Sequence, residues 1–287
     1  MTTARRGTLA MATAVALGAA LVGLGLPPAA AQGKRVAACP ADMVSVRGET
    51  CVDRYEAYVV ELLAGGKERA HSPLEPVAGL RVKAMNKKGA LPQAYISRDE
   101  AQAACENAGK RLCTDDEWLT ACRGKRPTAW PYGKERVVGR CNDHGTSSFN
   151  LVFGSDGQPP LPSEYTFEHL NDPRLNAMPG TLARAGSHAK CKSGFQVFDM
   201  VGNLHEWTAA SAGTFRGGYY LDVEQHGPGC EYRTTAHHAK YHDYSTGFRC
   251  CKKPGEKIRP TAPPKSKKAS VKKDSAKKKK GSAKPKT

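Results

Sequence analysis

The sequence lacks several features that would assign it to a common class of protein. No Cys-x-x-Cys motif occurs among its 287 residues, so the paired-thiolate spacing of a four-ligand zinc site is missing. Aromatic residues make up only 7% of the chain, and no internal repeat is visible. No apolar run after residue 31 is long enough to cross a bilayer, so we expect a soluble mature protein that is not transmembrane.

Net positive charge is small in most of the chain, although the formal net charge of the whole is +17. Residues 252–287 carry 15 Lys or Arg and two acids, which leaves a net charge of +13 for that segment. Residues 1–32 add +2, so residues 33–251 keep only +2. The basic character therefore belongs to the carboxyl-terminal segment, while the part that folds is close to neutral.

The amino-terminal segment has the pattern of a secretory signal peptide. It begins with two arginines, continues with an apolar run over residues 9–26, and ends with two prolines and three alanines before Gln32. This pattern predicts a signal peptide over 1–31 and export to the periplasm or the extracellular space. The alternative is an uncleaved membrane anchor, which the proline break and the small residues before Gln32 disfavour.

The carboxyl-terminal segment 252–287 consists mainly of Lys, Ala, Ser and Pro, without aromatic residues. It has too little apolar surface to offset the entropy of ordering, so we predict a disordered tail. A flexible cationic arm suits an anionic polymer or surface, and without aromatics it has no means of sequence-specific nucleic-acid recognition. The alternative is a solubilising tail with no partner. Nothing in the sequence indicates the oligomeric state.

Ten cysteines lie between the predicted signal peptide and the tail. An even number of cysteines in an exported chain predicts a disulfide framework, but the spacing alone leaves the pairing open. Cys250 and Cys251 are adjacent, so on an extended strand they point in opposite directions and need different partners.

Residues 33–251 read as one α+β domain with little regular secondary structure. Capping boxes at Ser97 and Thr114 predict two helix starts, with stops at Gly109 and Gly124. Short apolar runs elsewhere, such as 195–201 and 215–221, suit short strands among long loops. Residues 143–189 are rich in proline and show no clear periodicity, which is typical of a functional or family-specific segment.

Several short motifs follow one another over about 155 residues. They are ISRDEA (96–101), AGKRLCTDDEW (108–118), CRG (122–124), WPYG (130–133), FDMVGNLHEWT (198–208), FRGG (215–218) and GFRC (247–250). In this order they resemble the sulfatase-modifying-factor family, whose type member is the formylglycine-generating enzyme. The segment 39–56, with CP, MV and CVDRYE, resembles the opening of secreted bacterial members. The resemblance implies an irregular, disulfide-rich, C-type-lectin-like fold.

The resemblance also implies disulfides and a calcium site. Two family disulfides correspond to Cys105–Cys250 and Cys122–Cys230, and by remainder and proximity we expect Cys39–Cys51, Cys141–Cys191 and Cys113–Cys251. The family's calcium loop corresponds to Asp199, Gly202, Leu204 and Glu206. Two carboxylates and two carbonyls from a glycine-containing turn are hard oxygen ligands that suit Ca²⁺. The alternative is that Glu206 bonds to backbone N–H groups while Trp207 fills the core.

The catalytic cysteines of the family are missing. Formylglycine-generating enzymes hold copper(I) and the substrate thiol with two cysteines shortly after a Gly-Gly pair. Here Gly217-Gly218 leads to Tyr219 in place of serine and to Asp222 in place of the first cysteine. A hard carboxylate does not replace a soft thiolate, so copper is not expected.

Other chemistry near this position remains open. Asp222, with His237 and His242, forms a weak candidate set for an acid–base site or for iron or zinc. His237 and His242 would have to converge across a turn, whereas the adjacent His237 and His238 face opposite ways on a strand. Glu224 and His226 belong to the same neighbourhood, and the alternative is that all of these are exposed loop residues. His205 replaces a usual aromatic of the family, and we expect it to fill that space half-buried.

These observations predict an exported, disulfide-linked domain that acts as a binding module without oxidase activity. One alternative is an oxidoreductase of the same fold with a non-cysteine site near Asp222. Another is a divergent formylglycine-generating oxidase acting on protein cysteine, for which Cys250 and Cys251 are the local candidate thiols; we expect both to be oxidised.

Overall fold

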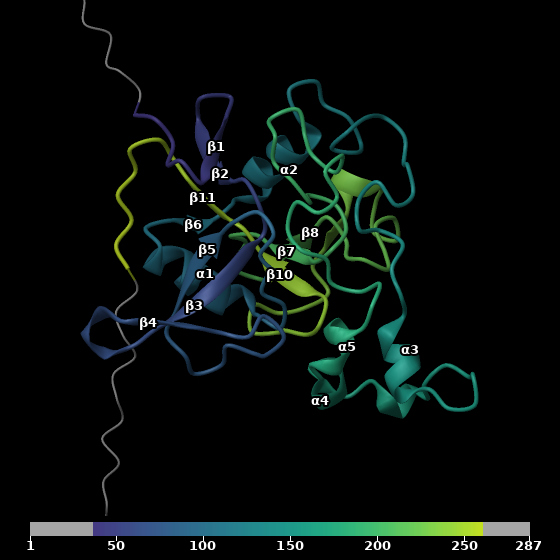
Figure 1. Cartoon of the computed structure of the whole chain (residues 1–287). Coiled ribbons are helices and arrows are strands. Elements are labelled where there is room, and N and C mark those ends of the chain that lie inside the picture. The colour runs from purple at the N-terminus through teal and green to yellow at the C-terminus, as the bar shows by residue number, and fades with distance from the viewer. Residues whose placement is uncertain (1–36, 261–287) are drawn as a thin grey trace, which may run out of the picture. The chain divides into compact units, whose positions relative to one another are not determined.

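Three small sheets organise the part of the chain that the structure, a computed structural model, describes, which is residues 37–260 (Figure 1). The predicted signal peptide and residues 261–287 of the predicted tail lie outside the described residues. No described helix is long and apolar enough to cross a membrane.

The first sheet joins the two ends of the described chain. Its order is β1-β2-β11-β6, and all of its pairs are antiparallel. The strand β11, near the carboxyl end, lies between a strand from the start of the domain and one that follows the first helix. The bounds are Met43–Val46 for β1, Thr50–Asp53 for β2, Cys250–Lys252 for β11 and Arg111–Leu112 for β6.

The second and third sheets are equally small. The second, in the order β10-β7-β8-β9, contains a parallel pair between β10 and β7. The third, in the order β4-β3-β5, is antiparallel and packs on α1. The bounds are Thr246–Phe248 (β10), His205–Trp207 (β7), Phe215–Arg216 (β8), Arg233–Thr234 (β9), Glu68–Ala70 (β4), Ala57–Leu62 (β3) and Val82–Asn86 (β5).

The two predicted helix starts are confirmed. The helix α1 spans Arg98–Asn107 and α2 spans Asp115–Arg123, each with a complete capping box at the residue before it. In each box the cap hydroxyl accepts the N–H of the glutamate three residues on, and that glutamate accepts the cap N–H. The buried faces of these helices enter two core clusters, with Trp118 of α2 fully buried.

Residues 143–189 contain three short helices that the sequence pattern did not reveal. They are α3 (Ser148–Phe153), α4 (Phe167–Leu170) and α5 (Arg174–Ala177), which lie together in Figure 1. Stacked rings join α3 to α4, with 4.2 Å between the ring centroids of Phe153 and His169. Single-turn 3-10 helices complete the structure at Ala64–Gly66, Pro162–Glu164 and Gly229–Glu231.

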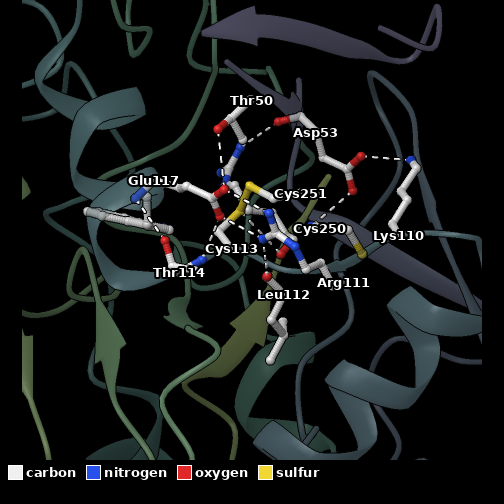
Figure 2. Close-up of a disulfide and its surroundings, with 12 residues drawn as sticks. Thr50, Asp53, Lys110, Arg111, Leu112, Cys113, Thr114, Glu117, Cys250 and Cys251 are labelled. Carbon is white, nitrogen blue, oxygen red and sulfur yellow. Dashed lines mark hydrogen bonds and ion pairs between the residues drawn. A yellow bond between two sulfur atoms is a disulfide. The ribbon is translucent and has the colours of Figure 1, made fainter. Parts of the chain in front are cut away.

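The ten cysteines form five disulfides, and no cysteine is free. Cys250 and Cys251 on β11 have different partners on the α1 and α2 sides, and Figure 2 shows Cys113 bonded to Cys251. The pairs are those expected above: Cys39–Cys51, Cys105–Cys250, Cys113–Cys251, Cys122–Cys230 and Cys141–Cys191.

A buried polar pair supports the same sheet. The Asp53 carboxylate accepts a hydrogen bond from Lys110 Nζ at 2.7 Å and from the Cys250 N–H at 3.0 Å (Figure 2). Burial is the larger effect and raises the pKa of Asp53 to about 6, although Lys110 and the Cys250 N–H act to lower it. Through these hydrogen bonds Asp53 joins strand β2 to β11 and to the residue before β6, and no disulfide runs from β2 to either of them.

Two sequence expectations need correction. Residues 195–201 form no strand and contribute only an isolated bridge at Phe198, because Gln196 and Asp199 adopt positive φ and bend the chain. The domain also extends beyond residue 251. Lys252 ends β11, with its ammonium donating to the Gly109 carbonyl at 2.8 Å, and Glu256 lies 3.7 Å from Arg111.

Candidate functional site

The Gly217-Gly218 turn that follows β8 is sterically restricted to glycine. Both residues have positive φ, 83° and 69°. A Cβ at Gly217 would lie 2.6 Å from the Met200 carbonyl oxygen, and one at Gly218 would lie 2.2 Å from the Asp222 carbonyl oxygen. The turn therefore folds the next four residues back on themselves, with the Tyr219 N–H donating to the Asp222 carbonyl at 2.8 Å.

Asp222 acts as the acceptor in a turn. One carboxylate oxygen accepts the N–H groups of Glu224 and Gln225, both at 3.0 Å. The other accepts the Tyr232 hydroxyl at 3.0 Å. With these bonds the Asp222 carboxylate stabilises its own loop. It offers no soft ligand at the position where the family has a cysteine.

Aromatic rings surround the same turn. The His205 ring lies 4.4 Å from Phe215, 4.9 Å from Tyr219 and 5.3 Å from Tyr232, between ring centroids. His205 is 6% exposed, and its Nδ1 has no hydrogen-bond partner among the described residues. Burial lowers the pKa of His205 to about 3, so the ring is neutral at physiological pH. The histidine fills this space more completely than expected from the sequence.

The other candidate residues have separate partners. His237 stacks on Tyr241 at 3.8 Å, and His242 Nδ1 lies 2.7 Å from the amide oxygen of Asn171. Among residues 37–260, no three His, Cys, Asp or Glu side chains are placed to hold a metal ion. The weak candidate set of Asp222, His237 and His242 is therefore not assembled as a metal site.

The remaining residues near this turn also contact groups other than a common centre. Glu224 pairs with Arg136 at 2.5 Å, His226 meets the edge of the Tyr232 ring, and His238 accepts the Lys240 N–H. These contacts agree with the alternative that this stretch consists of loop residues.

The predicted calcium loop contains an ion pair that the sequence analysis missed. Both oxygens of Glu206 accept from the Arg249 guanidinium, at 2.5 and 2.6 Å, and the Trp118 indole N–H donates to the same carboxylate at 2.7 Å. Arg249 and Glu206 are 0% and 1% exposed at the side chain. The GFRC motif contained the only signal for this arginine.

Asp199 and Glu56 add two further buried carboxyl groups. Asp199, at φ +56°, accepts the Gly186 N–H at 2.6 Å. Glu56 accepts the Asn203 amide at 2.6 Å through one oxygen, and its other oxygen has no partner among the described residues. Burial first, and then the neighbouring carboxylates, raise the pKa of Glu56 well above its usual range; burial raises the pKa of Asp199 to about 7.

This acid cluster, Glu56, Asp199 and Glu206 with Arg249, has more acids than bases. Burial raises the pKa of Glu56 and Asp199, so protonation balances part of the charge, and no group of three His, Cys, Asp or Glu side chains among residues 37–260 is placed to hold a metal ion. Glu206 does not fit as a calcium ligand while Arg249 and Trp118 hold both of its oxygens. The other two predicted ligands are the carbonyls of Gly202 and Leu204, which belong to the same loop. Calcium binding at this loop stays a prediction.

Comparison with known proteins gives the family. The model of the sulfatase-modifying factor enzyme 1-like domain matches residues 44–254. Two curated relatives, both named inactive C-alpha-formylglycine-generating enzyme 2, are 26% identical. The protein from Mus musculus matches over 64% of this chain and 54% of its own length, and that from Bos taurus over 66% and 60%. The chain thus spans little more than half the length of these relatives.

Similar solved structures include the Major Tropism Determinant I1 variant, at 13% identity and a TM-score of 0.43, covering 76% of this chain and 54% of that one. Treponema denticola variable protein 1 gives 14% identity and a TM-score of 0.39, covering 71% and 84%. The family match spans most of the described residues and includes both the Gly217-Gly218 turn and the acid cluster. The chain therefore belongs to the sulfatase-modifying-factor family, and its described part has an irregular, disulfide-rich α+β fold.

Proposed function

We propose that this chain is a binding module of the sulfatase-modifying-factor family and does not form formylglycine. The observation that carries the proposal is Asp222, a turn-forming carboxylate at the position of the family's first catalytic cysteine. Copper(I) needs soft sulfur ligands, and a carboxylate bonded to two N–H groups and a hydroxyl offers none.

The state of the cysteines supports the same proposal. All ten are in disulfides, and nine of them have buried side chains, Cys39 being the exception. The proposed divergent oxidase would need two reduced thiols, and Cys250 and Cys251 are each bonded to another partner. The curated relatives are themselves named inactive enzymes, which agrees with a family branch that lost this chemistry.

We propose further that the protein acts outside the cytoplasm. Five disulfides persist only in an oxidising compartment or when protected from reduction. The signal peptide predicted over 1–31 accounts for such a location, and the Lys-rich residues after 260 would hold the domain near anionic surfaces.

The proposal that the chain does not form formylglycine is tested with the full chain. Purified protein, loaded with copper(I) under reducing conditions, is incubated with oxygen and a cysteine-containing sulfatase peptide, and aldehyde formation is followed by mass spectrometry. An active formylglycine-generating enzyme serves as positive control. We expect no aldehyde, and no titratable thiol in denaturant without reductant. Aldehyde above the peptide-only blank, or two titratable thiols, would overturn the proposal.

Metal analysis addresses the remaining oxidoreductase alternative. The protein is freed of loosely bound ions on a chelating resin and measured by plasma mass spectrometry. We expect no redox-active metal, because His237 and His242 are bonded to different groups and Asp222 shapes its own turn. Iron or copper near one equivalent per chain would contradict the binding-module proposal.

A further inference from the structure

A pocket of about 880 Å³ opens beside the carboxyl end of α2, away from the aromatic rings around His205. Its walls come from the segment after α2 and from the segment around Cys191. Lys and Arg account for seven of the sixteen lining residues, and none of the sixteen is acidic. The seven are Arg123, Lys125, Arg126, Lys134, Arg140, Lys190 and Lys192, which we call the cationic pocket.

Most of these cations have no internal counter-charge. Arg123 pairs with Glu231 at 2.5 Å. Within residues 37–260, none of the other six has a carboxylate at ion-pair distance. Since residues 33–251 carry a net charge of only +2, so many cations around one pocket are a local concentration of charge. Like charges gathered in a concave surface repel one another and raise the local concentration of anions.

The backbone that carries these side chains is firmly held. The Cys141–Cys191 disulfide joins the residue after Arg140 to the residue between Lys190 and Lys192. The two walls also meet closely at glycines, since a Cβ on Gly124 would lie 3.0 Å from the Gly194 nitrogen. The backbone positions of the cations are therefore fixed before a ligand arrives, so binding has to order only their side chains.

The one aromatic side chain in the lining is already covered. The Arg140 guanidinium lies over the Tyr132 ring at 4.7 Å from its centroid, and the Trp130 ring stacks with Tyr132 at 6.3 Å. This leaves no open ring for a nucleobase, and base stacking is what single-stranded nucleic-acid sites depend on. A single chain that carries anionic groups and no bases fits best.

We propose that the cationic pocket binds an anionic polysaccharide through its sulfate or carboxylate groups. Arginine offers paired N–H donors to such groups, and lysine adds point charges. The inference rests on the proposed binding role and gives that role a ligand class and a place. The proposed binding site is distinct from the predicted tail, because every residue of the pocket lies within the described domain.

The test compares two full-length triple variants that remove equal charge. K125S/R126S/K190S alters three exposed cations of the pocket, whereas K67S/K87S/K88S alters three exposed lysines elsewhere. Binding of a fluorescent heparin fragment is measured between 50 and 300 mM NaCl, with neutral dextran as the uncharged probe. Both variants keep the tail, so its contribution is the same in each.

We expect the pocket variant to lose at least about tenfold in affinity for the heparin fragment. The magnitude of the slope of log affinity against log salt should fall by about 2, because three contacts are lost and each contributes about 0.7. The control variant should keep both values. Equal losses in the two variants would overturn the proposal, as would a thymidine oligonucleotide that binds more tightly than heparin and depends on the same three cations.

Lysine footprinting locates the ligand independently of affinity. Wild-type protein is acylated with and without heparin, and modified lysines are identified by mass spectrometry. We expect protection of Lys125, Lys134, Lys190 and Lys192 but not of Lys87. Bound heparin that leaves the pocket lysines reactive would contradict the proposal. Aldehyde formation in the peptide assay would overturn the proposed function and leave these binding results standing, so the two failures are distinct.

Discussion

Arg249 and Glu206 form a two-point ion pair at the centre of the domain, where both side chains are out of contact with solvent. Arg249 lies between β10 and β11, and Glu206 lies on β7. The guanidinium also donates to the carbonyls of Asp53 at 3.1 Å and Phe198 at 2.9 Å. One side chain thus connects the first sheet, the second sheet and the loop before Asp199.

Removing the arginine should be strongly destabilising. In R249L, Glu206 loses its counter-charge beside two other buried acids, so we expect the free energy of unfolding to fall by about 3–5 kcal/mol in urea titrations. R249K, which retains the charge without the paired donors, should lose less. The surface pair of Arg69 with Glu61 supplies the control, because R69L should change stability by no more than about 0.5 kcal/mol. A loss below about 1 kcal/mol in R249L would contradict this role.

His205 should be replaceable by an aromatic ring with a gain in stability. Its buried Nδ1 has no partner among the described residues, and three aromatic rings surround it. H205F removes that polar atom and keeps the ring, so we expect thermal unfolding to show a gain of about 1 kcal/mol. H242F is the matched control, because His242 bonds to Asn171 at 2.7 Å and its loss should cost about 1 kcal/mol. If H205F is less stable than wild type, the histidine has a polar role that the described contacts do not show.

Local signals in the sequence were sufficient for some elements and insufficient for others. The capping boxes at Ser97 and Thr114 fix two helix starts, because both partners of each box lie within four residues. The strand β8 has two residues, and its register comes from pairing Phe215 with Trp207 and Thr234. No periodicity exists over two residues, so only the tertiary contacts define such a strand.

Some parts of the candidate site could likewise be predicted from the sequence, and others could not. The missing cysteine at Asp222 is visible in a motif, because the Gly-Gly pair fixes its position in the chain. The acid cluster is not visible, since Glu56, Asp199 and Arg249 are each at least fifty positions apart in the sequence and meet only after folding. The cationic pocket was hidden for a similar reason: its charges come from two segments joined by a disulfide, in a region of near-zero net charge.

Asp115 should make stability depend on pH in the acid range. Burial raises the pKa of its carboxyl, but the hydrogen bonds and charge of Arg216, with the charge of Arg233, outweigh burial and hold the pKa below its usual 3.8. The folded state therefore binds this proton less readily than the unfolded state. The resulting stability is present above about pH 4 and is lost as the pH falls further through the folded pKa.

D115N tests this sign. We expect D115N to lower the free energy of unfolding by about 1 kcal/mol at pH 7, and the difference from wild type to shrink as the pH is lowered from 5 to about 2.5. D116N removes the next charge of the same helix start, where the side chain is exposed, and should show a smaller change. Identical pH profiles for D115N and wild type would show that the two arginines do not stabilise the charged form.

Calcium should stabilise the protein through the loop at Asp199. The acid cluster holds three carboxyl groups against one arginine, so a hard cation beside Asp199 would replace the proton that burial favours there, without displacing Arg249 from Glu206. At ten times its dissociation constant, such a ligand adds about 1.4 kcal/mol, which corresponds to a rise of about 3 °C in Tm for a domain of this size. Tm is measured by calorimetry with calcium and then with a chelator. D199N should abolish the rise, whereas D116N, which removes an equal charge at the surface, should keep it. An unchanged Tm in wild type would mean that Arg249 and protonation of the remaining acids are sufficient to balance the cluster.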